Sequence, residues 1–300
     1  MEASLEKKNI EVQPINRQTF AQRLRSYKRS PFSLVLLILV SLSALITVMT
    51  LLFLIAYILV KGVPYLTADL FAWEYNSENV SLMPALVNTI IMTGLSLLIA
   101  GPLGVFAAIY LVEYAKRGNK LVEIVRVTAE TLSGIPSIVY GLFGFLLFAV
   151  TFKWSYTIMG GALTLAIMIL PLIMRTTEEA LKSVPDSYRE GSFGLGAGRL
   201  RTVFKIVLPS AVPGILAGMI LAVGRIVGET AALMYTAGTV AGIPKNLFGS
   251  GRTLAVHMYV LTNEGLYTNQ SYATAVVLLV IVLCINLISG IIAKKVAAKQ

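Results

Sequence analysis

Long apolar runs, almost free of charge, are the feature that most restricts what this 300-residue chain can fold into. A helix that crosses a bilayer needs about 20 apolar residues. Six segments reach that length: 32–60, 85–112, 124–152, 157–174, 211–239 and 273–293. The chain is 56% hydrophobic and only 13% charged, whereas a soluble domain carries roughly a quarter charged residues. We therefore expect an all-α integral membrane protein with six transmembrane helices.

Basic residues indicate the orientation of these helices. Nineteen of the 25 Lys and Arg residues lie in the two tails and the two loops on one side, and four lie on the other. Because cytoplasmic segments carry the excess of Lys and Arg, we expect both termini to face the cytoplasm. Residues 1–31 and 294–300 would be basic cytoplasmic tails. No cleavage site follows the first apolar run, so 32–60 is interpreted as a retained helix in the cell membrane.

Two arginines lie inside apolar runs, each with a glutamate four residues later: Arg126 with Glu130, and Arg225 with Glu229. Charges at membrane depth are costly and usually mark a substrate or ion pathway. Arg225 follows Ala211 by 14 residues, or about 21 Å of helix, which is past the middle of a hydrocarbon core of about 30 Å. Arg126 lies near a boundary and could extend to the interface.

Two interpretations of these pairs stay open. Each pair could be an internal salt bridge that locks helices together. Alternatively, a resting contact between Arg225 and Glu229 could yield when an oxyanion enters, because the planar guanidinium matches carboxylate and phosphate oxygens. Small residues share the face of Arg225 and leave room for a neighbour or a crevice: Gly214, Gly218, Ala222, Gly228 and Ala232. Arg175, directly after the fourth span, is either a further pathway residue or an interfacial anchor.

The 175–209 loop has the pattern of a folded segment. Ser187 and Glu190 have the spacing of a helix-capping box downstream of Pro185, and a glycine-rich turn follows. A second short helix, closed by Pro209, would carry one apolar face. Its residues are Leu200, Val203, Phe204 and Val207. Such a helix–turn–helix either lies on lipid headgroups or docks into a partner's groove.

The same loop carries a motif of the form E-A-A-x3-G-x9-I-x-L-P. Its positions are Glu190, Gly191, Ser192, Gly196, Ile206, Leu208 and Pro209, with Gly191 and Ser192 in place of the two alanines. Through this motif the chain resembles the inner-membrane permease subunits of ABC importers. The resemblance implies that the loop holds a coupling helix, which sits in a cleft of a separate ATP-hydrolysing subunit.

Three further stretches, 135–144, 170–181 and 225–233, are similar to the PstA family of permease subunits of phosphate-specific ABC importers. This resemblance implies a MetI-like permease core over 84–293, with 32–60 as an extra N-terminal helix. It also implies four kinds of partner: the bilayer, a PstC-like permease subunit, PstB-like ATPase subunits and a PstS-like external phosphate-binding protein.

Missing motifs narrow the function further. The chain has no G-x4-G-K-[ST] for ATP and no G-x-S-x-G or H-E-x-x-H, so we expect a transport subunit without catalytic residues, rather than an enzyme. A lone His257 and a lone Cys284 predict neither a metal site nor a cofactor. The net charge of +10 is explained by orientation and does not indicate nucleic acid. The alternatives are import of another oxyanion such as sulfate, and a proton-coupled anion carrier in which Glu130 or Glu229 takes up protons.

Overall fold

The computed structural model describes residues 31–297 apart from 117, with side chains for 32–291. The chain divides into two units, one that ends at Tyr57 and one that begins at Ile58. Within the described residues every regular element is a helix. The predicted basic N-terminal tail lies outside these residues up to position 30, and so do the last residues of the C-terminal tail.

The first unit contains most of α2, Pro31–Gly62. Its sequence is apolar on every side, with a mean hydropathy of 2.7 over its most apolar window. Nearly all of its side chains are exposed. A helix that is hydrophobic all round needs an apolar environment on every face, so α2 has the properties expected of the first membrane span.

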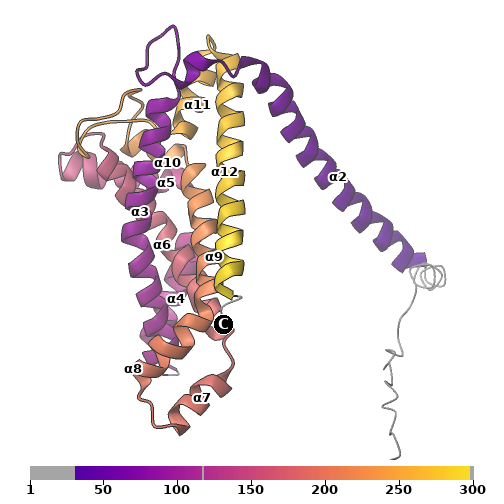
Figure 1. Cartoon of the computed structure of the whole chain (residues 1–300), viewed down its shortest axis with the longest axis vertical. Coiled ribbons are helices and arrows are strands. Elements are labelled where there is room, and N and C mark those ends of the chain that lie inside the picture. The colour runs from indigo at the N-terminus through magenta and orange to yellow at the C-terminus, as the bar shows by residue number, and fades with distance from the viewer. Residues whose placement is uncertain (1–30, 117, 298–300) are drawn as a thin grey trace, which may run out of the picture. The chain divides into compact units, whose positions relative to one another are not determined.

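Four long helices form the bundle of the second unit (Figure 1). They are α3 (Met83–Ile109), α6 (Ile158–Lys182), α9 (Leu208–Val227) and α12 (Thr268–Ala297). Helix α3 packs along α6, α6 along α9, and α9 along α12. Small residues allow this close approach: a Cβ added at Gly104 would lie 2.8 Å from Ile173 Cγ2, and one at Gly214 would lie 2.7 Å from Ala180 Cβ.

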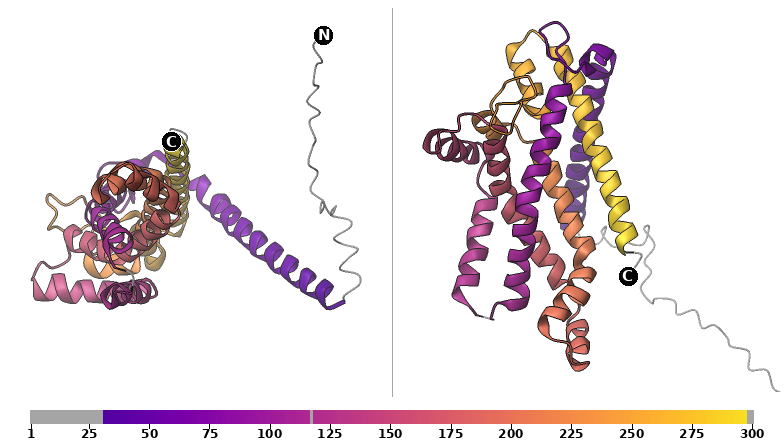
Figure 2. Two further views of the ribbon diagram at one scale, coloured as in Figure 1. Left: turned by 90° about the horizontal axis from the view of Figure 1, so that it is seen from below. Right: turned by 60° about the vertical axis from the view of Figure 1, so that its left-hand side comes forward.

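The expected third span, 124–152, is a broken helix. Helix α4 (Lys120–Ser133) and the segment Ser137–Thr151, which comprises α5 (Ser137–Gly144) and the π-helical turn η4 (Phe145–Thr151), meet at 103°. Pro136 explains the break, because proline lacks an N–H and disfavours helical geometry at the residue before it. Figure 2 shows α4 beside the main bundle.

The expected fifth span, 211–239, begins earlier and ends earlier than predicted. One continuous helix covers Arg199–Val227 and comprises α8 (Arg199–Thr202), a π-helical turn η5 (Val203–Val207) and α9. Pro209 therefore does not close a helix. It lies inside this continuous helix, shortly after the π-helical turn η5, although proline removes a backbone hydrogen bond in a helix interior. After Val227 the chain breaks, and a separate short helix follows, α10 (Ala231–Thr236).

Five helices of the described residues are long and apolar enough to cross a membrane, and α4 with the bent segment after it gives a sixth if the pair counts as one span. The fourth span, α6, reaches Lys182 and is longer than the predicted 157–174.

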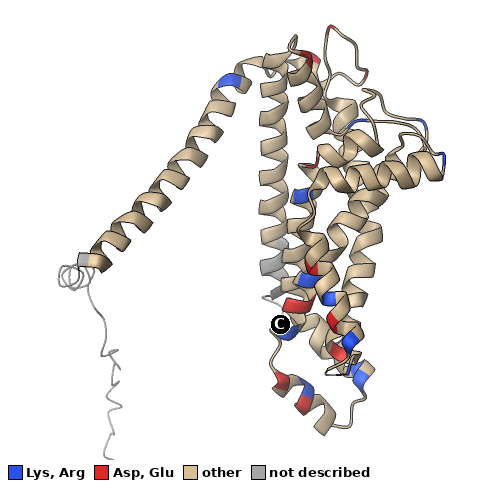
Figure 3. Cartoon of the chain, turned by 180° about the vertical axis from the view of Figure 1, so that it is seen from behind, with Lys and Arg blue, Asp and Glu red and all other residues tan. Residues whose placement is uncertain are grey.

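The bundle has two distinct ends. One end carries α7 (Asp186–Gly194), and most charged residues of the second unit gather towards it (Figure 3). The other end carries α11 (Leu254–Glu264). Two short helical turns, η1 (Val63–Tyr65) and η2 (Ala68–Phe71), precede α3. We call the two ends of the bundle the α7 end and the α11 end.

Candidate functional site

Arg225 lies near the end of α9, directly before the break that separates α9 from α10. Its side chain is half-buried, and within the described part of the chain it forms no ion pair or hydrogen bond. The hydroxyl of Tyr140 in α5 lies within electrostatic reach of the charge of Arg225. That hydroxyl donates a hydrogen bond of 2.8 Å to the carbonyl of Leu132, so Tyr140 ties α5 to the last turn of α4. Arg225 therefore lies at the junction of two broken helices.

The segments beyond the two breaks pack against each other. Helix α5 contacts α10, and a Cβ added at Gly141 would lie 2.8 Å from the Cα of Ala232. In membrane proteins, non-helical backbone at depth is tolerated where protein surrounds it or where it lines a water-filled cavity. Transporters place substrate sites at such discontinuous helices. An uncompensated guanidinium at this junction is suited to an oxyanion.

Glu229 does not pair with Arg225, and the expected resting contact is therefore wrong. The helical register that would bring residues i and i+4 together ends at Val227. Glu229 is instead buried, and its Oε1 accepts a hydrogen bond of 3.0 Å from the backbone N–H of Ala232. The carboxylate thus caps the first turn of α10, a role that the short break dictates.

Arg126 and Glu130 also fail to form the pair that their spacing suggests. Arg126 Nε lies 2.7 Å from Oε1 of Glu178 on α6. Glu130 Oε1 lies 3.8 Å from Nη1 of Arg175, whose Nε contacts Glu179 Oε1 at 3.4 Å. The charges therefore connect α4 to α6, because α6 extends as a helix past its apolar part.

These charged residues line a cavity of about 230 Å³ between α4 and α6. Lys182 also reaches Glu178 there, with 2.7 Å between Nζ and Oε1. Sequence reasoning missed Glu178, Glu179 and Lys182. The i,i+4 spacing of 175 with 179 and of 178 with 182 was the available signal, and it indicates that the helix continues.

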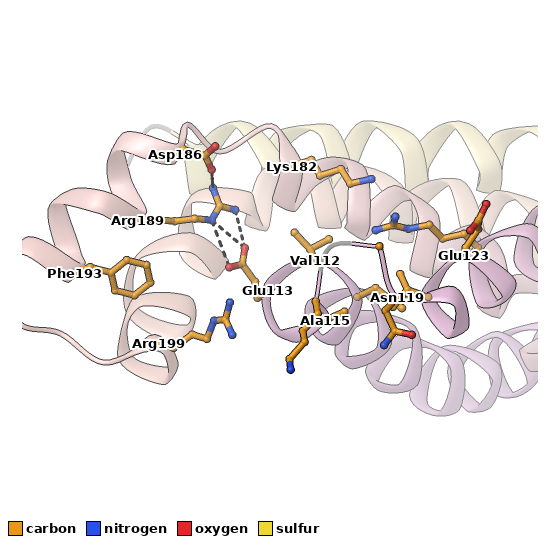
Figure 4. A pocket seen from close by; sticks show the side chains of 15 residues that line it. Val112, Glu113, Ala115, Asn119, Glu123, Lys182, Asp186, Arg189, Phe193 and Arg199 are labelled. Atoms are coloured by element: carbon orange, nitrogen blue, oxygen red, sulfur yellow. Dashed lines mark hydrogen bonds and ion pairs between the residues drawn. The ribbon is translucent and has the colours of Figure 1, made fainter.

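A second charge pair lies at the α7 end and was not predicted (Figure 4). Arg189 on α7 contacts the buried carboxylate of Glu113, in the π-helical turn η3 (Tyr110–Tyr114) that continues α3. Its Nη2 lies 2.7 Å from Glu113 Oε1, and its Nε lies 3.2 Å from the same atom. The guanidinium also donates to the carbonyls of Leu181 and Val184 at 3.0 and 2.8 Å. One side chain thus joins α3, α6 and α7.

The motif residues of the 175–209 loop fall on both sides of the turn between α7 and α8. Ser192 is buried, and its Oγ lies 2.8 Å from Oγ1 of Thr202, which ties the two helices together. Gly196 has a φ of +80°, a conformation that favours glycine. Glu190 and Gly191 are exposed. The remaining motif residues are half-buried around the start of α9: Ile206, Leu208 and Pro209.

Two local expectations for this loop are wrong. Pro185 itself precedes the first turn of α7, and no side chain caps the helix, so Ser187 is not the cap of a capping box. The apolar face of the second helix is divided. Val203 and Val207 are buried in the bundle, whereas Leu200 and Phe204 are 66% and 41% exposed. Together with exposed Phe193 and Leu195 of the α7 side, these residues form an apolar surface at the α7 end. We call Phe193, Leu195, Leu200 and Phe204 the α7-end surface.

Next to this surface, a cavity of about 920 Å³ lies between α7, α8 and the loop that joins η3 to α4. Its lining includes the Glu113–Arg189 pair, Lys116 and Arg199. The guanidinium of Arg199 lies over the ring of Tyr114, 5.6 Å from its centroid. The cavity therefore has a wall of fixed charges, positioned by the same contacts that hold α7 in place.

Comparison with known proteins finds relatives that are similar to this chain over most of its length. The chain is 36% identical over 252 residues to the probable ABC transporter permease protein YqgI of Bacillus subtilis, covering 78% of this chain and 85% of the relative. It is 32% identical over 270 residues to the phosphate transport system permease protein PstA of Haemophilus influenzae, covering 89% of this chain and 95% of the relative.

The fold is also found in a solved structure. An inward-facing MetNI methionine ABC transporter matches 72% of this chain and 94% of its own, with a TM-score of 0.59 and 22% identity. This match confirms the expected MetI-like fold. The sequence profile of a family described as binding-protein-dependent transport system inner membrane component matches residues 100–299. The chain belongs to this family of membrane components of binding-protein-dependent transport systems.

Proposed function

We propose that this chain is a permease subunit of an ATP-driven importer of inorganic phosphate. It would form the translocation path with a second, PstC-like permease subunit. PstB-like ATPase subunits would drive it, and a PstS-like binding protein would deliver phosphate from outside. The relatives named as phosphate permeases support the choice of phosphate, since their similarity extends over most of this chain.

The observation that carries the proposal is the position of Arg225. A half-buried guanidinium without a carboxylate partner in the described chain lies beside the gap between α9 and α10, within electrostatic reach of Tyr140 in the bent segment after α4. An arriving phosphate would supply the missing negative charge and match the donor fork. Arg175, Arg126 and Glu130 lie in a separate network between α4 and α6. We assign them a secondary place on the path, on the side of α7.

We further propose that the α7 end faces the cytoplasm, with both termini on that side. Residues 84–293 would form the permease domain, 32–60 an additional membrane helix and 175–209 the coupling loop. The α7-end surface would then contact an ATPase subunit. Because Arg189 joins α7 to α3 and α6, a movement of α7 on the ATPase would pass directly into the helices of the bundle.

Uptake of radiolabelled phosphate tests the proposal, in cells that lack this chain and carry either the wild type or Arg225→Lys. We expect the wild type to restore uptake, sulfate to compete poorly, and Arg225→Lys to abolish most of the uptake. Lys153→Arg, an exposed position at the other end of the α5 segment, is the matched control.

Two outcomes would contradict the proposal. Uptake that stops when the proton gradient is collapsed, although ATP remains, would indicate the proton-coupled carrier. Full competition by sulfate would assign the path to another oxyanion. The carrier alternative has little support from Glu229, because its carboxylate accepts a backbone hydrogen bond in the break.

A further inference from the structure

A buried cluster at the α11 end is separate from Arg225 and from the coupling loop. Its centre is Arg252, which lies two residues before the start of α11 and is only 4% exposed. Hydrogen bonds of its backbone hold this residue in place. Its N–H donates to the carbonyl oxygen of Val240 at 2.9 Å, and its own carbonyl oxygen accepts from Nδ2 of Asn88 on α3 at 3.2 Å. The position of the side chain is therefore set by two elements of the fold.

Two side chains accompany Arg252. The ring of Tyr75 lies over its guanidinium, with 4.8 Å from Cζ to the ring centroid. The same ring is edge-on to the imidazole of His257, with 6.2 Å between centroids. His257 is on α11 and is completely buried. Arg252 and His257 thus share one aromatic neighbour and lie within electrostatic reach of each other.

The polar atoms of this cluster lack partners within the described residues. Arg252 Nε and Nη2 are buried and make no hydrogen bond, and the same is true of both ring nitrogens of His257. The backbone of Val80 approaches the imidazole without a hydrogen bond of ordinary geometry. Buried donors and acceptors without partners are costly, so four such atoms in one place call for a further component.

Charge leads to the same conclusion. No carboxylate in the described chain pairs with Arg252, and the acidic residues of the α11 end are exposed at positions 69, 74, 78 and 264. An uncompensated buried charge is strongly unfavourable, and one aromatic face offsets only part of that cost. Arg189 shows the completed arrangement: the Nε and Nη2 edge that is empty in Arg252 contacts the carboxylate of Glu113.

We propose that Arg252 and His257 form a second anion site, which binds a small free oxyanion such as inorganic phosphate. The Nε and Nη2 atoms of Arg252 would donate hydrogen bonds to two oxygens of the ion, and the imidazole of His257 would donate a hydrogen bond to a third oxygen. The four nitrogen atoms are buried, so a small ion suits the site better than a side chain of a partner protein.

The protonation of His257 suits this role. Burial, and next the charge of Arg252, lower the pKa of His257 to about 3. The imidazole is therefore neutral at physiological pH and offers one N–H donor. The site also differs from the proposed substrate path, because it lies at the α11 end, whereas Arg225 lies at the junction of the broken helices. Anion binding here would hold even if the chain transported something other than phosphate.

The test uses the purified, assembled transport complex and follows its thermal unfolding as inorganic phosphate replaces chloride at constant ionic strength. We expect phosphate to raise the Tm of the wild type and of Arg225→Gln. In Arg252→Gln, the half-maximal phosphate concentration should rise about tenfold or more. Lys245→Gln, an exposed lysine of the same segment, is the matched control and should respond like the wild type.

An unchanged phosphate response in Arg252→Gln, or a response that is lost only in Arg225→Gln, would overturn the proposal. A cryo-EM map of the wild-type complex in phosphate gives a readout that does not depend on how the variant folds. Tetrahedral density against the Nε and Nη2 edge of Arg252 supports the site. Density for water alone, or none, refutes it.

Discussion

Nη2 of Arg189 lies 2.7 Å from Oε1 of Glu113, so a residue of α7 binds a buried carboxylate at the end of α3. The two residues are 76 positions apart in the sequence. Both are largely buried, with side chains 15% and 8% exposed. Removal of one partner from a buried ion pair leaves an uncompensated charge, whereas an exposed pair contributes little.

Glu113→Gln should therefore destabilise the protein by about 3–5 kcal/mol, measured as a lower Tm of the purified complex. The control is Asp186→Asn, because Asp186 contacts the same guanidinium at 3.2 Å but is 77% exposed. We expect that change to cost less than about 1 kcal/mol. Equal effects of the two substitutions would show that burial of the Glu113 pair is unimportant.

Arg225→Lys tests geometry rather than charge. Lysine keeps the positive charge but loses the planar donor fork, so we expect phosphate uptake to fall about tenfold or more while the complex still assembles. Uptake of labelled phosphate and co-purification with the ATPase subunit are the two measurements. Normal uptake by a well-expressed variant would remove Arg225 from the proposed path.

Gly196→Ala and Gly194→Ala form a matched pair in the proposed coupling loop. A Cβ at either position would meet no atom within 4 Å, but only Gly196 has a positive φ, of +80°. Alanine at 196 should cost about 1–2 kcal/mol of backbone strain and disturb the turn between α7 and α8. Gly194→Ala lies in a helix and should be neutral or slightly stabilising.

We expect Gly196→Ala to lower the amount of phosphate transported per ATP hydrolysed, and a bulkier residue at 196 or at Glu190 to lower it further. The ratio is measured in proteoliposomes. If both alanine variants retain the wild-type ratio, and the bulky variants do too, the loop does not couple hydrolysis to transport.

Stability should decrease in mild acid because of His257. Its pKa is lowered to about 3 in the folded protein by burial and by Arg252, whereas an unfolded histidine titrates near 6.5. Between these two pH values only the unfolded chain takes up the proton. The contribution of His257 to the free energy of unfolding is therefore fully present above about pH 6.5 and is lost as the pH falls. At pH 5 the loss from this group is about 2 kcal/mol.

The measurement compares the Tm of the complex at about pH 7.5 and pH 5 for the wild type and for His257→Gln. Carboxylates contribute equally to both proteins, so the decrease should be smaller in the variant. An identical decrease would mean that His257 takes up its proton in the folded state as readily as in the unfolded chain.

The apolar runs predicted the membrane helices well, because helix formation and burial in lipid depend on residues close together in the sequence. The broken spans were harder. Pro136 supplied a signal for the break after α4, but the continuous apolar pattern on both sides concealed it. For α9, the glycine and glutamate after Val227 were interpreted as part of a helix, since their effect depends on the cap that Glu229 provides to α10.

By itself, the sequence determined the class of the protein, and it located both the motif of the proposed coupling loop and Arg225 within an apolar segment. Only the tertiary structure decided which charges meet. Arg126 bonds to Glu178, Arg189 to Glu113, and Arg252 to no acid in the described chain. Coulombic partners are chosen by distance in space, and helix breaks and helix ends set those distances in ways that sequence spacing does not encode.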